Sequence, residues 1–263
     1  MLCCPKCQCA LIKDKKRFYC ENGHSYDIAK RGYVNLMPSM QKQSGDDKDM
    51  VKARTMFLSQ GYYEPLRTTL TNIIDSLSIK TLVDAGCGEG YYTNEVKIKH
   101  PQIEIIGFDV SKFAIDEACK ASVGVQYTVC SVFHMPLQDK SVQAVLSVFA
   151  PFDEKEMYRV LEDDGYFIRV SPGKRHLMGL KEVLYQDVYE NEDTSKQLEG
   201  FVLYDRKEVA YTIQINNAQQ IWALFQMTPY YWKSSKQASD QLKGISSLET
   251  EVVFEIDVYK KIK

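Results

Sequence analysis

The feature that most limits how this chain can fold is a regular alternation of strand-like and helix-like segments between residues 82 and 170. Short apolar runs in this stretch are typical of buried strands, and the segments between them have helical spacing. The expected strands are 82–85, 103–108, 125–129, 142–149 and 165–170, and the expected helices are 91–99, 112–120 and 154–161. Strands that alternate with helices through short connections form a doubly wound α/β sheet.

The segments outside this region have patterns of their own. Residues 50–77 show helical spacing that breaks near Gly61, and residues 176–190 also have a helical pattern. Residues 252–259 alternate between apolar and polar side chains, which predicts an antiparallel strand at an edge of the sheet. No apolar run approaches the ~20 residues of a membrane-spanning helix, and the basic, polar N-terminus excludes a signal peptide. We therefore expect a cytoplasmic protein with no membrane partner.

Five of the eight cysteines lie within the first 20 residues, and four metal-ligating side chains form two closely spaced pairs. Cys4 and Cys7 make a C-x2-C pair, and Cys20 is followed four positions later by His24. Tight turns of this kind hold thiolate and imidazole ligands at a separation that a tetrahedral zinc ion bridges. Because all four ligands come from the protein, the pattern predicts one closed, structural Zn²⁺ site. A redox-active C-x2-C pair is the alternative.

Composition divides the chain into three parts. Residues 1–37 hold the predicted zinc module, residues 38–49 are polar and lack periodicity, as a linker does, and residues 50–263 hold the α/β domain. The module contains two further thiols, Cys3 and Cys9, and whether either substitutes as a ligand stays open. The first 54 residues carry 11 Lys or Arg against 6 Asp or Glu, whereas the remainder carries 22 against 29. A basic head on an acidic body favours a polyanionic partner.

A glycine-rich loop follows the first predicted strand of the alternating region. Residues 83–90 read Val-Asp-Ala-Gly-Cys-Gly-Glu-Gly, and glycines at this point let the backbone approach a ligand at the carboxyl end of the strand. Asp109 ends the next strand, 21 residues after Gly88, where an acid that binds ribose hydroxyls is expected. The glycine spacing differs from the G-x-G-x-x-G pattern of dinucleotide-binding sites.

This combination resembles the class I S-adenosylmethionine-dependent methyltransferases, whose cofactor has a ribose but no pyrophosphate. The resemblance implies a Rossmann-like sheet and S-adenosylmethionine as the cofactor. The residues that it places along the cofactor are Gly86, Gly88 and Glu89 beside the methionine and ribose portion, Asp84 at the amino-acid tail and Asp109 at the ribose hydroxyls. The loop after the third strand offers no acid for the adenine amine, so that contact falls to Ser131 or to the main chain.

Several collinear blocks narrow the resemblance to the bacterial 23S ribosomal RNA (guanine-N1)-methyltransferases. Besides the zinc pattern, the matching blocks are residues 30–36, 61–66, 86–93, 108–112, 172–178 and 226–229. The resemblance implies that Cys4, Cys7, Cys20 and His24 are the zinc ligands and that Tyr63, Gly88, Glu89 and His176 contact the cofactor.

The family methylates N1 of one guanine in a domain II hairpin of 23S rRNA, near the macrolide site. The implied function therefore bears on antibiotic resistance. The implied partners are 23S rRNA or a precursor of the large ribosomal subunit, and a second copy of the chain in a homodimer.

Methyl transfer to guanine N1 requires loss of the proton that this nitrogen carries at neutral pH. A general base, or a donor that stabilises the O6 anion, is therefore expected. The candidates follow the fourth predicted strand, where Phe149 and Phe152 could stack on the guanine and Asp153 could be the base. Asp153 also stands where a helix N-cap belongs, so the sequence assigns no catalytic base.

Cations alternate with aromatic residues in the head, a pattern that combines phosphate contact with base stacking. The predicted RNA-binding residues are Lys15, Lys16, Arg17, Phe18, Lys30, Arg31 and Tyr33. Aromatic side chains that pack on the zinc core are the alternative for this pattern. Two other functions stay open: a small-molecule methyltransferase with a zinc lid, and a non-catalytic ribosome-binding factor.

Overall fold

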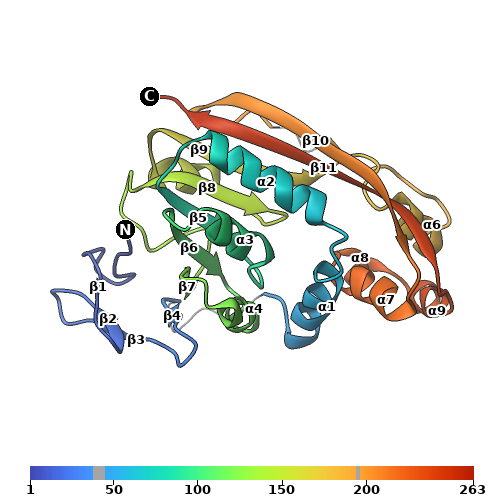
Figure 1. Cartoon of the computed structure of the whole chain (residues 1–263), viewed down its shortest axis with the longest axis horizontal. Helices are drawn as coiled ribbons and strands as arrows, with labels where there is room; N and C mark the ends of the chain where they lie inside the picture. The colour runs from blue at the N-terminus through green and yellow to red at the C-terminus, as the bar shows by residue number, and fades with distance from the viewer. Residues whose placement is uncertain (38–44, 194–195) are drawn as a thin grey trace.

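The computed structural model describes residues 1–37, 45–193 and 196–263, and an eight-stranded sheet forms its centre (Figure 1). The strand order is β10-β11-β9-β8-β5-β6-β7-β4. The strands predicted from the alternating pattern are β5 (Thr81–Ala85), β6 (Glu104–Asp109), β7 (Gln126–Val129), β8 (Val142–Val148) and β9 (Leu161–Pro172). They pair in parallel, so the predicted Rossmann-like sheet is confirmed.

Different elements cover the two faces of this sheet. On one face lie α2 (Glu64–Ser76) and α3 (Tyr91–Lys99), whose apolar side chains share a core with Leu82 and Leu146 (Figure 1). On the other face, Met157 of α5 (Glu154–Val160) lies in a core that also contains Val83 and Val145. Neighbouring strand residues enter different cores because successive side chains of a strand point to opposite faces.

The N-terminal residues 1–37, called the head below, pack on this second face. The head contains an antiparallel ribbon of β1 (Ile12–Lys13), β2 (Arg17–Tyr19) and β3 (Ser25–Asp27), followed by β4 (Val34–Asn35), which pairs in parallel with β7. Residues 130–141, all of them described, connect β7 to β8 without a helix. Leu2 and Leu36 of the head instead join Val83 and Phe108 of the sheet in one core. The head therefore covers a part of the sheet that a crossover helix would otherwise cover.

The carboxyl-terminal part of the chain differs from the prediction. β11 (Leu248–Lys261) pairs antiparallel with β9 on one side and with β10 (Phe201–Ile215) on the other, so the prediction of an edge strand is wrong. β10 is the outer strand, and most of its side chains are exposed, which leaves its sequence without a recognisable apolar pattern. The helix expected at 176–190 shortens to α6 (Met178–Leu184).

Two groups of helices flank the sheet. α1 (Lys48–Leu58) and α2 are separated at Gly61, where φ is +80°, so the predicted break is confirmed. Figure 1 shows α7 (Ala218–Gln226), α8 (Tyr230–Lys233) and α9 (Lys236–Lys243) at the opposite end of the molecule from the head. Of the expected linker, residues 38–44 lie outside the described residues, and residues 45–47 lead directly into α1. No helix of the described residues is long and apolar enough to cross a lipid bilayer.

Candidate functional site

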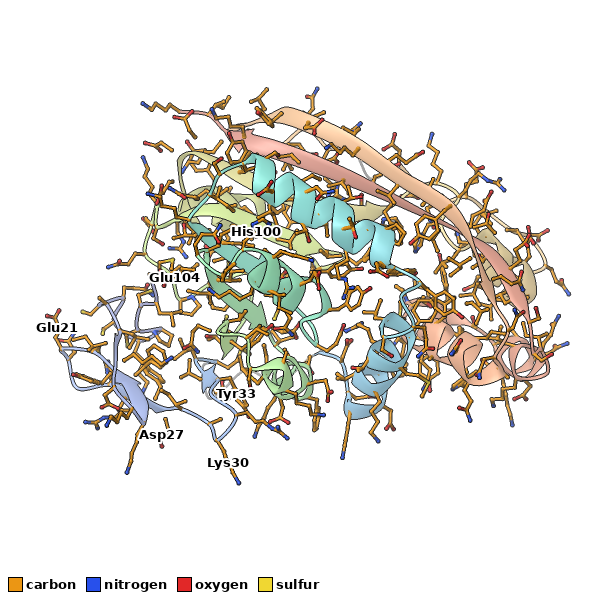
Figure 2. The ribbon with its side chains drawn as sticks, in the orientation of Figure 1. Glu21, Asp27, Lys30, Tyr33, His100 and Glu104 are labelled. Carbon is orange, nitrogen blue, oxygen red and sulfur yellow. The ribbon has the colours of Figure 1, made fainter. Side chains whose placement is uncertain are left out.

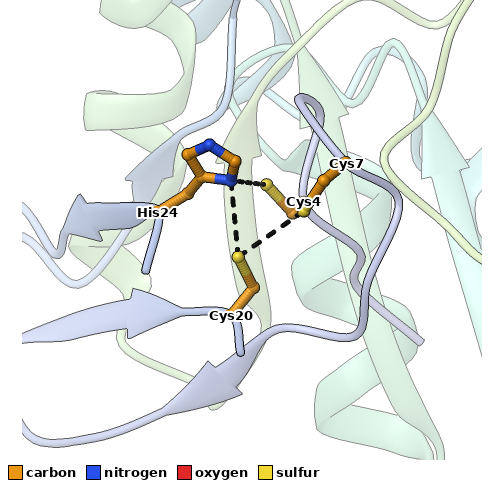
Figure 3. Close-up of side chains that lie close together, drawn as sticks. All are labelled: Cys4, Cys7, Cys20 and His24. Atoms are coloured by element: carbon orange, nitrogen blue, oxygen red, sulfur yellow. Dashed lines mark hydrogen bonds between the residues drawn. The ribbon is translucent and has the colours of Figure 1, made fainter. Parts of the chain in front are cut away.

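The four predicted metal ligands come together in the head (Figure 3). Their ligand atoms all lie within 4.8 Å of one another. His24 Nδ1 is 3.4 Å from Cys4 Sγ and 3.5 Å from Cys20 Sγ, and the Sγ atoms of Cys7 and Cys20 are 3.6 Å apart. Zinc–sulfur bonds of about 2.3 Å in a tetrahedron set the ligand atoms about 3.8 Å apart. The donor set and its spacing therefore fit one structural zinc ion.

The hydrogen bonds around the zinc site show that Cys3 and Cys9 do not replace any of the four ligands. Cys3 Sγ donates to Gln8 Oε1 at 3.2 Å, and Cys9 Sγ donates to the carbonyl oxygen of Cys7 at 3.6 Å, so both lie outside the ligand set. The Tyr26 hydroxyl lies 3.1 Å from Cys4 Sγ. With a thiolate at that position the hydroxyl donates, and such outer-sphere hydrogen bonds orient zinc ligands.

The predicted cofactor residues around the glycine loop also come together, at the carboxyl ends of β5 and β6. We call Asp84, Gly86, Gly88, Glu89 and Asp109 the donor cradle. The carboxylate of Asp109 accepts from the backbone N–H of Gly88 at 3.0 Å and of Ser111 at 2.7 Å. Gly86 has a φ of +87° and lies so close to Ala150 that a Cβ atom would come within 2.4 Å of the alanine Cβ. Only glycine combines this backbone conformation with this approach.

The carboxylates of the donor cradle retain free hydrogen-bonding capacity. Asp84 Oδ2 accepts from the Thr93 hydroxyl at 2.5 Å, but Asp84 Oδ1 and Glu89 Oε2 are buried and have no hydrogen-bond partner among the residues that the structure describes. Burial raises the pKa of both carboxyl groups to about 7, and it also raises the pKa of Asp109. Unpaired buried acceptors are costly unless a ligand satisfies them. The cradle therefore fits a ligand that carries hydroxyl and cationic groups, as S-adenosylmethionine does.

Tyr63 and His176 lie together beside β11. Their ring centroids are 6.3 Å apart, and Phe254 contacts both rings. His176 Nδ1 accepts from the backbone N–H of Val253 at 3.1 Å, which leaves the proton of the neutral imidazole on Nε2. Burial lowers the pKa of His176 to about 3, so the ring is neutral at physiological pH. Phe149, 44% exposed, lies 5.8 Å from the His176 ring.

The other two catalytic candidates are engaged elsewhere. Asp153 caps α5, where its carboxylate accepts from the backbone N–H of Lys155 at 2.9 Å, so the N-cap interpretation is confirmed. Phe152 packs against Phe167 with ring centroids 5.0 Å apart, and the cationic group of Lys196 lies 5.9 Å from its ring. Both side chains line a cavity of about 300 Å³ on the α5 side of the sheet. Ser131 accepts from the N–H of Phe133 at 3.2 Å, within its own turn.

The structure corrects part of the predicted RNA-binding set. Phe18 is 4% exposed and Tyr33 5% exposed, so neither ring offers a face to a nucleobase, and the stacking prediction is wrong for these two. Both rings pack in apolar cores instead.

The cations of the set are exposed. Arg17 pairs with Asp14 at 3.2 Å and Arg31 with Asp116 at 3.6 Å, and Lys15, Lys16 and Lys30 complete the set. Lys30 projects from the lower side of the head, away from the sheet (Figure 2).

The β1–β2 turn lies at the amino ends of the parallel strands, opposite the donor cradle. Lys13 Nζ, next to the turn, donates to Gln126 at the start of β7 at 2.6 Å. Glu104, at the start of β6, also lies beside the head (Figure 2). Along β6, six residues from Glu104 to Asp109 span about 17 Å. The basic turn and the donor cradle are thus separated by roughly the length of one strand.

Sequence reasoning missed Arg54 and Thr93. Arg54 of α1 reaches the donor cradle from outside every glycine motif, and only the tertiary structure brings it there. Thr93 is the third residue of α3, three positions after Gly90 at the end of the glycine loop. Its position in the first turn of the helix after the glycine loop is the sequence signal that could have identified Thr93 as a partner of Asp84.

Comparisons with known proteins agree with this geometry. Residues 2–45 match the zinc-ribbon family model described as "RlmA, N-terminal", and residues 82–165 match the model described as "Methyltransferase domain". A solved chain from Bacillus halodurans C-125, described as a "putative methyltransferase", superposes with a TM-score of 0.50 at 15% identity. That superposition covers 74% of this chain and all of the other. It indicates a shared fold.

Two relatives are similar over longer stretches of sequence. A Bacillus subtilis protein named "Putative 23S rRNA (guanine-N(1)-)-methyltransferase YxjB" is 28% identical over 98% of this chain and 95% of its own length. A Streptomyces fradiae 23S rRNA (guanine(748)-N(1))-methyltransferase is 33% identical over 69% of this chain and 66% of its own. With the zinc cluster and the donor cradle, these matches show that the chain is an enzyme of the S-adenosylmethionine-dependent, zinc-binding 23S rRNA (guanine-N1)-methyltransferase family.

Proposed function

We propose that this enzyme transfers a methyl group from S-adenosylmethionine to N1 of a guanine in 23S rRNA. The observation that carries the proposal is the shared core of the zinc-bearing head and the methyltransferase sheet. This core fixes the exposed cations of the head relative to the donor cradle of the sheet. The Bacillus subtilis and Streptomyces fradiae relatives carry this activity in their names, which supports the same reaction here.

The finer target is a guanine in the domain II hairpin near the macrolide site. The guanine 748 specificity in the name of the Streptomyces fradiae relative supports a single defined position. Methylation there would alter the binding of macrolide-type antibiotics. The substrate is 23S rRNA or a precursor of the large subunit, which places the enzyme in the cytoplasm.

His176 and Phe149 are the residues that we assign to the acceptor base. S-adenosylmethionine supplies an electrophilic methyl group on a sulfonium. Guanine gains negative charge at O6 as the N1 proton leaves, and a neutral imidazole that donates from Nε2 stabilises such charge. His176 does not act as the base, because its Nδ1 already accepts from Val253. The exposed ring of Phe149 gives the guanine a surface on which to stack.

The remaining cations of the head are assigned to RNA phosphates. Lys15 and Lys16 lie on the β1–β2 turn, Arg17 begins β2, and Lys30 and Arg31 lie on the turn between β3 and β4. A hairpin that contacts the β1–β2 turn and reaches the donor cradle must bridge about 17 Å, a short distance for a helical RNA. We keep residues 1–37 as the RNA-recognition module. Because α1 begins at Lys48, we end the expected 38–49 linker at residue 47 and begin the methyltransferase domain at residue 48 instead of 50. We also propose that the chain acts as a homodimer.

The structure weighs against the two rival functions. A small-molecule enzyme with a zinc lid requires the head to cover the donor cradle, whereas the head packs on the second face of the sheet beside α5. A non-catalytic ribosome-binding factor has no need of buried carboxylate oxygens that accept no hydrogen bond from the described residues, and the donor cradle has two of them, Asp84 Oδ1 and Glu89 Oε2.

Mass spectrometry of 23S rRNA from cells with and without the protein tests the proposed function. We expect one 1-methylguanine to disappear from a domain II fragment when the protein is absent. A matched experiment uses the purified enzyme, labelled S-adenosylmethionine and domain II hairpin transcripts in which single guanines are replaced by adenine. Methylation should vanish for one replacement and persist for the others. Unchanged 23S rRNA in the deletion strain, together with no labelling of any transcript, would refute the proposal.

A further inference from the structure

Arg54 lies directly against the glycine loop of the donor cradle, although it belongs to none of the sequence motifs. Its Nη1 forms an ion pair with Asp46 and lies 3.7 Å from Glu89 Oε2. A Cβ atom built at Gly88 would lie 3.5 Å from the same nitrogen. The side chain is 24% exposed, so the guanidinium is partly shielded from water and partly open to a ligand.

Arg54 supplies positive charge to a cluster of carboxylates. Burial raises the pKa of Glu89 and of Asp109, and the positive charge of Arg54 opposes the shift at both groups. Asp46, the partner of Arg54, is itself anchored, because its carbonyl oxygen accepts from the Ser111 hydroxyl at 2.6 Å. Asp46 of the segment before α1 therefore holds the guanidinium at the cradle, and the Ser111 hydroxyl, after β6, fixes that segment in turn.

The charges of the methyl donor decide which of its groups suits Arg54. S-adenosylmethionine carries a sulfonium, an ammonium and one carboxylate, and its adenosine part is neutral. The two cationic groups match Asp84, Glu89 and Asp109, but the carboxylate would be repelled by them. A guanidinium matches a carboxylate in shape and charge. Within the described part of the chain, both ion pairs of Arg54 are made by Nη1, and a guanidinium has five N–H donors. We propose that Arg54 binds the α-carboxylate of S-adenosylmethionine.

A thermodynamic cycle between the residue and the ligand group tests this assignment. Isothermal titration of the zinc-loaded, full-length protein compares S-adenosylmethionine with decarboxylated S-adenosylmethionine, which lacks only the carboxylate. In Arg54→Met, affinity for S-adenosylmethionine should fall by about 10- to 100-fold, the value of a charge-assisted hydrogen bond. Affinity for the decarboxylated ligand should change by less than about threefold.

Arg67 of α2 provides a matched control. Its side chain has the same 24% exposure and also lies near two carboxylates, Glu64 and Glu95, outside the donor cradle. Arg67→Met should leave the affinity for both ligands unchanged. If Arg54→Met weakens the binding of both ligands equally, the proposal is overturned and Arg54 only supports the loop. If Arg54→Met weakens the binding of neither ligand, the proposal is overturned as well. If Arg54→Met does not fold, Arg54→Lys and Arg54→Gln provide the same comparison. No RNA is present, so the outcome does not depend on the proposed rRNA target.

Discussion

At the scale of single residues, burial shifts the pKa values of the donor-cradle carboxyl groups and of His176 in opposite directions. It raises the pKa of Asp84 and Glu89 to about 7 and lowers that of His176 to about 3. In each case loss of solvent disfavours the charged form. Near neutral pH the two carboxyl groups are therefore partly protonated in the free protein, whereas His176 is neutral. Binding and stability should both depend on pH as a result.

Binding of S-adenosylmethionine should release protons and should tighten as the pH rises from 6 to 8. A cationic ligand favours the ionised forms of Asp84 and Glu89, whose pKa values lie in this range. Titration calorimetry in two buffers of different ionisation enthalpy measures the number of protons released. Glu89→Gln should reduce that number, and a wild-type protein that releases none would contradict the assignment of these carboxylates to the donor.

The pH dependence of stability should identify His176 as a buried neutral base. Its folded pKa lies below the unfolded value of 6.5, so between about pH 3 and 6.5 the unfolded chain binds more protons. Its contribution is complete above pH 6.5 and is lost as the pH falls, with a slope of at most about 1.4 kcal/mol per pH unit.

The His176→Gln variant isolates this contribution from that of Asp84 and Glu89, whose raised pKa values act in the opposite sense. We expect the difference in unfolding free energy between wild type and variant to shrink between pH 7.5 and pH 5. Urea unfolding at the two pH values measures it. A difference that stays constant would mean that His176 is not buried as a neutral ring.

At the scale of elements, the start of α5 distinguishes two interpretations of Asp153, as the N-cap of the helix or as the general base. As an N-cap, Asp153 is replaceable by Asn, which caps equally well, but not by Ala. As a general base it is replaceable by neither, because Asn accepts no proton. The observed hydrogen bond to the N–H of Lys155 favours the cap.

Asp153→Asn should retain RNA methylation within about twofold of wild type and should retain its stability. Asp153→Ala should lose about 1 kcal/mol of unfolding free energy. Thermal unfolding and single-turnover methylation of the hairpin measure the two effects. A stable Asp153→Asn variant with methylation reduced a hundredfold or more would restore Asp153 as the catalytic base.

At the scale of the whole molecule, the zinc site stabilises more than the head. Leu2 and Leu36 share a core with Val83 and Phe108, so loss of the head would expose part of the second face of the sheet. Zinc-bound modules of this size depend on the ion for folding. Zinc loss should therefore lower the stability of the methyltransferase sheet. It should affect the donor cradle less, because the cradle is built from residues 84–109, outside the head.

The double variant Cys4→Ser, Cys7→Ser should lose zinc, melt at a lower temperature and fail to methylate RNA. Below its melting range it should bind S-adenosylmethionine within a few-fold of wild type. Cys9→Ser is the control, because this thiol lies outside the ligand set and should keep the metal. Metal analysis, calorimetry and methylation assays measure these outcomes. Unimpaired RNA methylation in the zinc-free variant would exclude the head from substrate recognition.

The sequence alone determined the features that depend on local spacing. The paired metal ligands, the glycine loop and the succession of strands and helices along residues 82–170 each follow from spacing within a few residues or from a repeated apolar pattern. Asp109 is similar, because the length of a strand–helix–strand unit places it beside Gly88. The structure shows these features where they were expected.

The tertiary structure alone decided which side chains face solvent and which distant segments meet. Phe18 and Tyr33 have the pattern of RNA-stacking residues, yet the packing of the head on the sheet buries them. β10, with its exposed side chains, becomes recognisable only through its pairing with β11. Arg54 reaches Gly88 because α1 folds back over a loop more than 30 positions away. Burial and long-range pairing depend on the partner that each segment meets, and no local pattern specifies that partner.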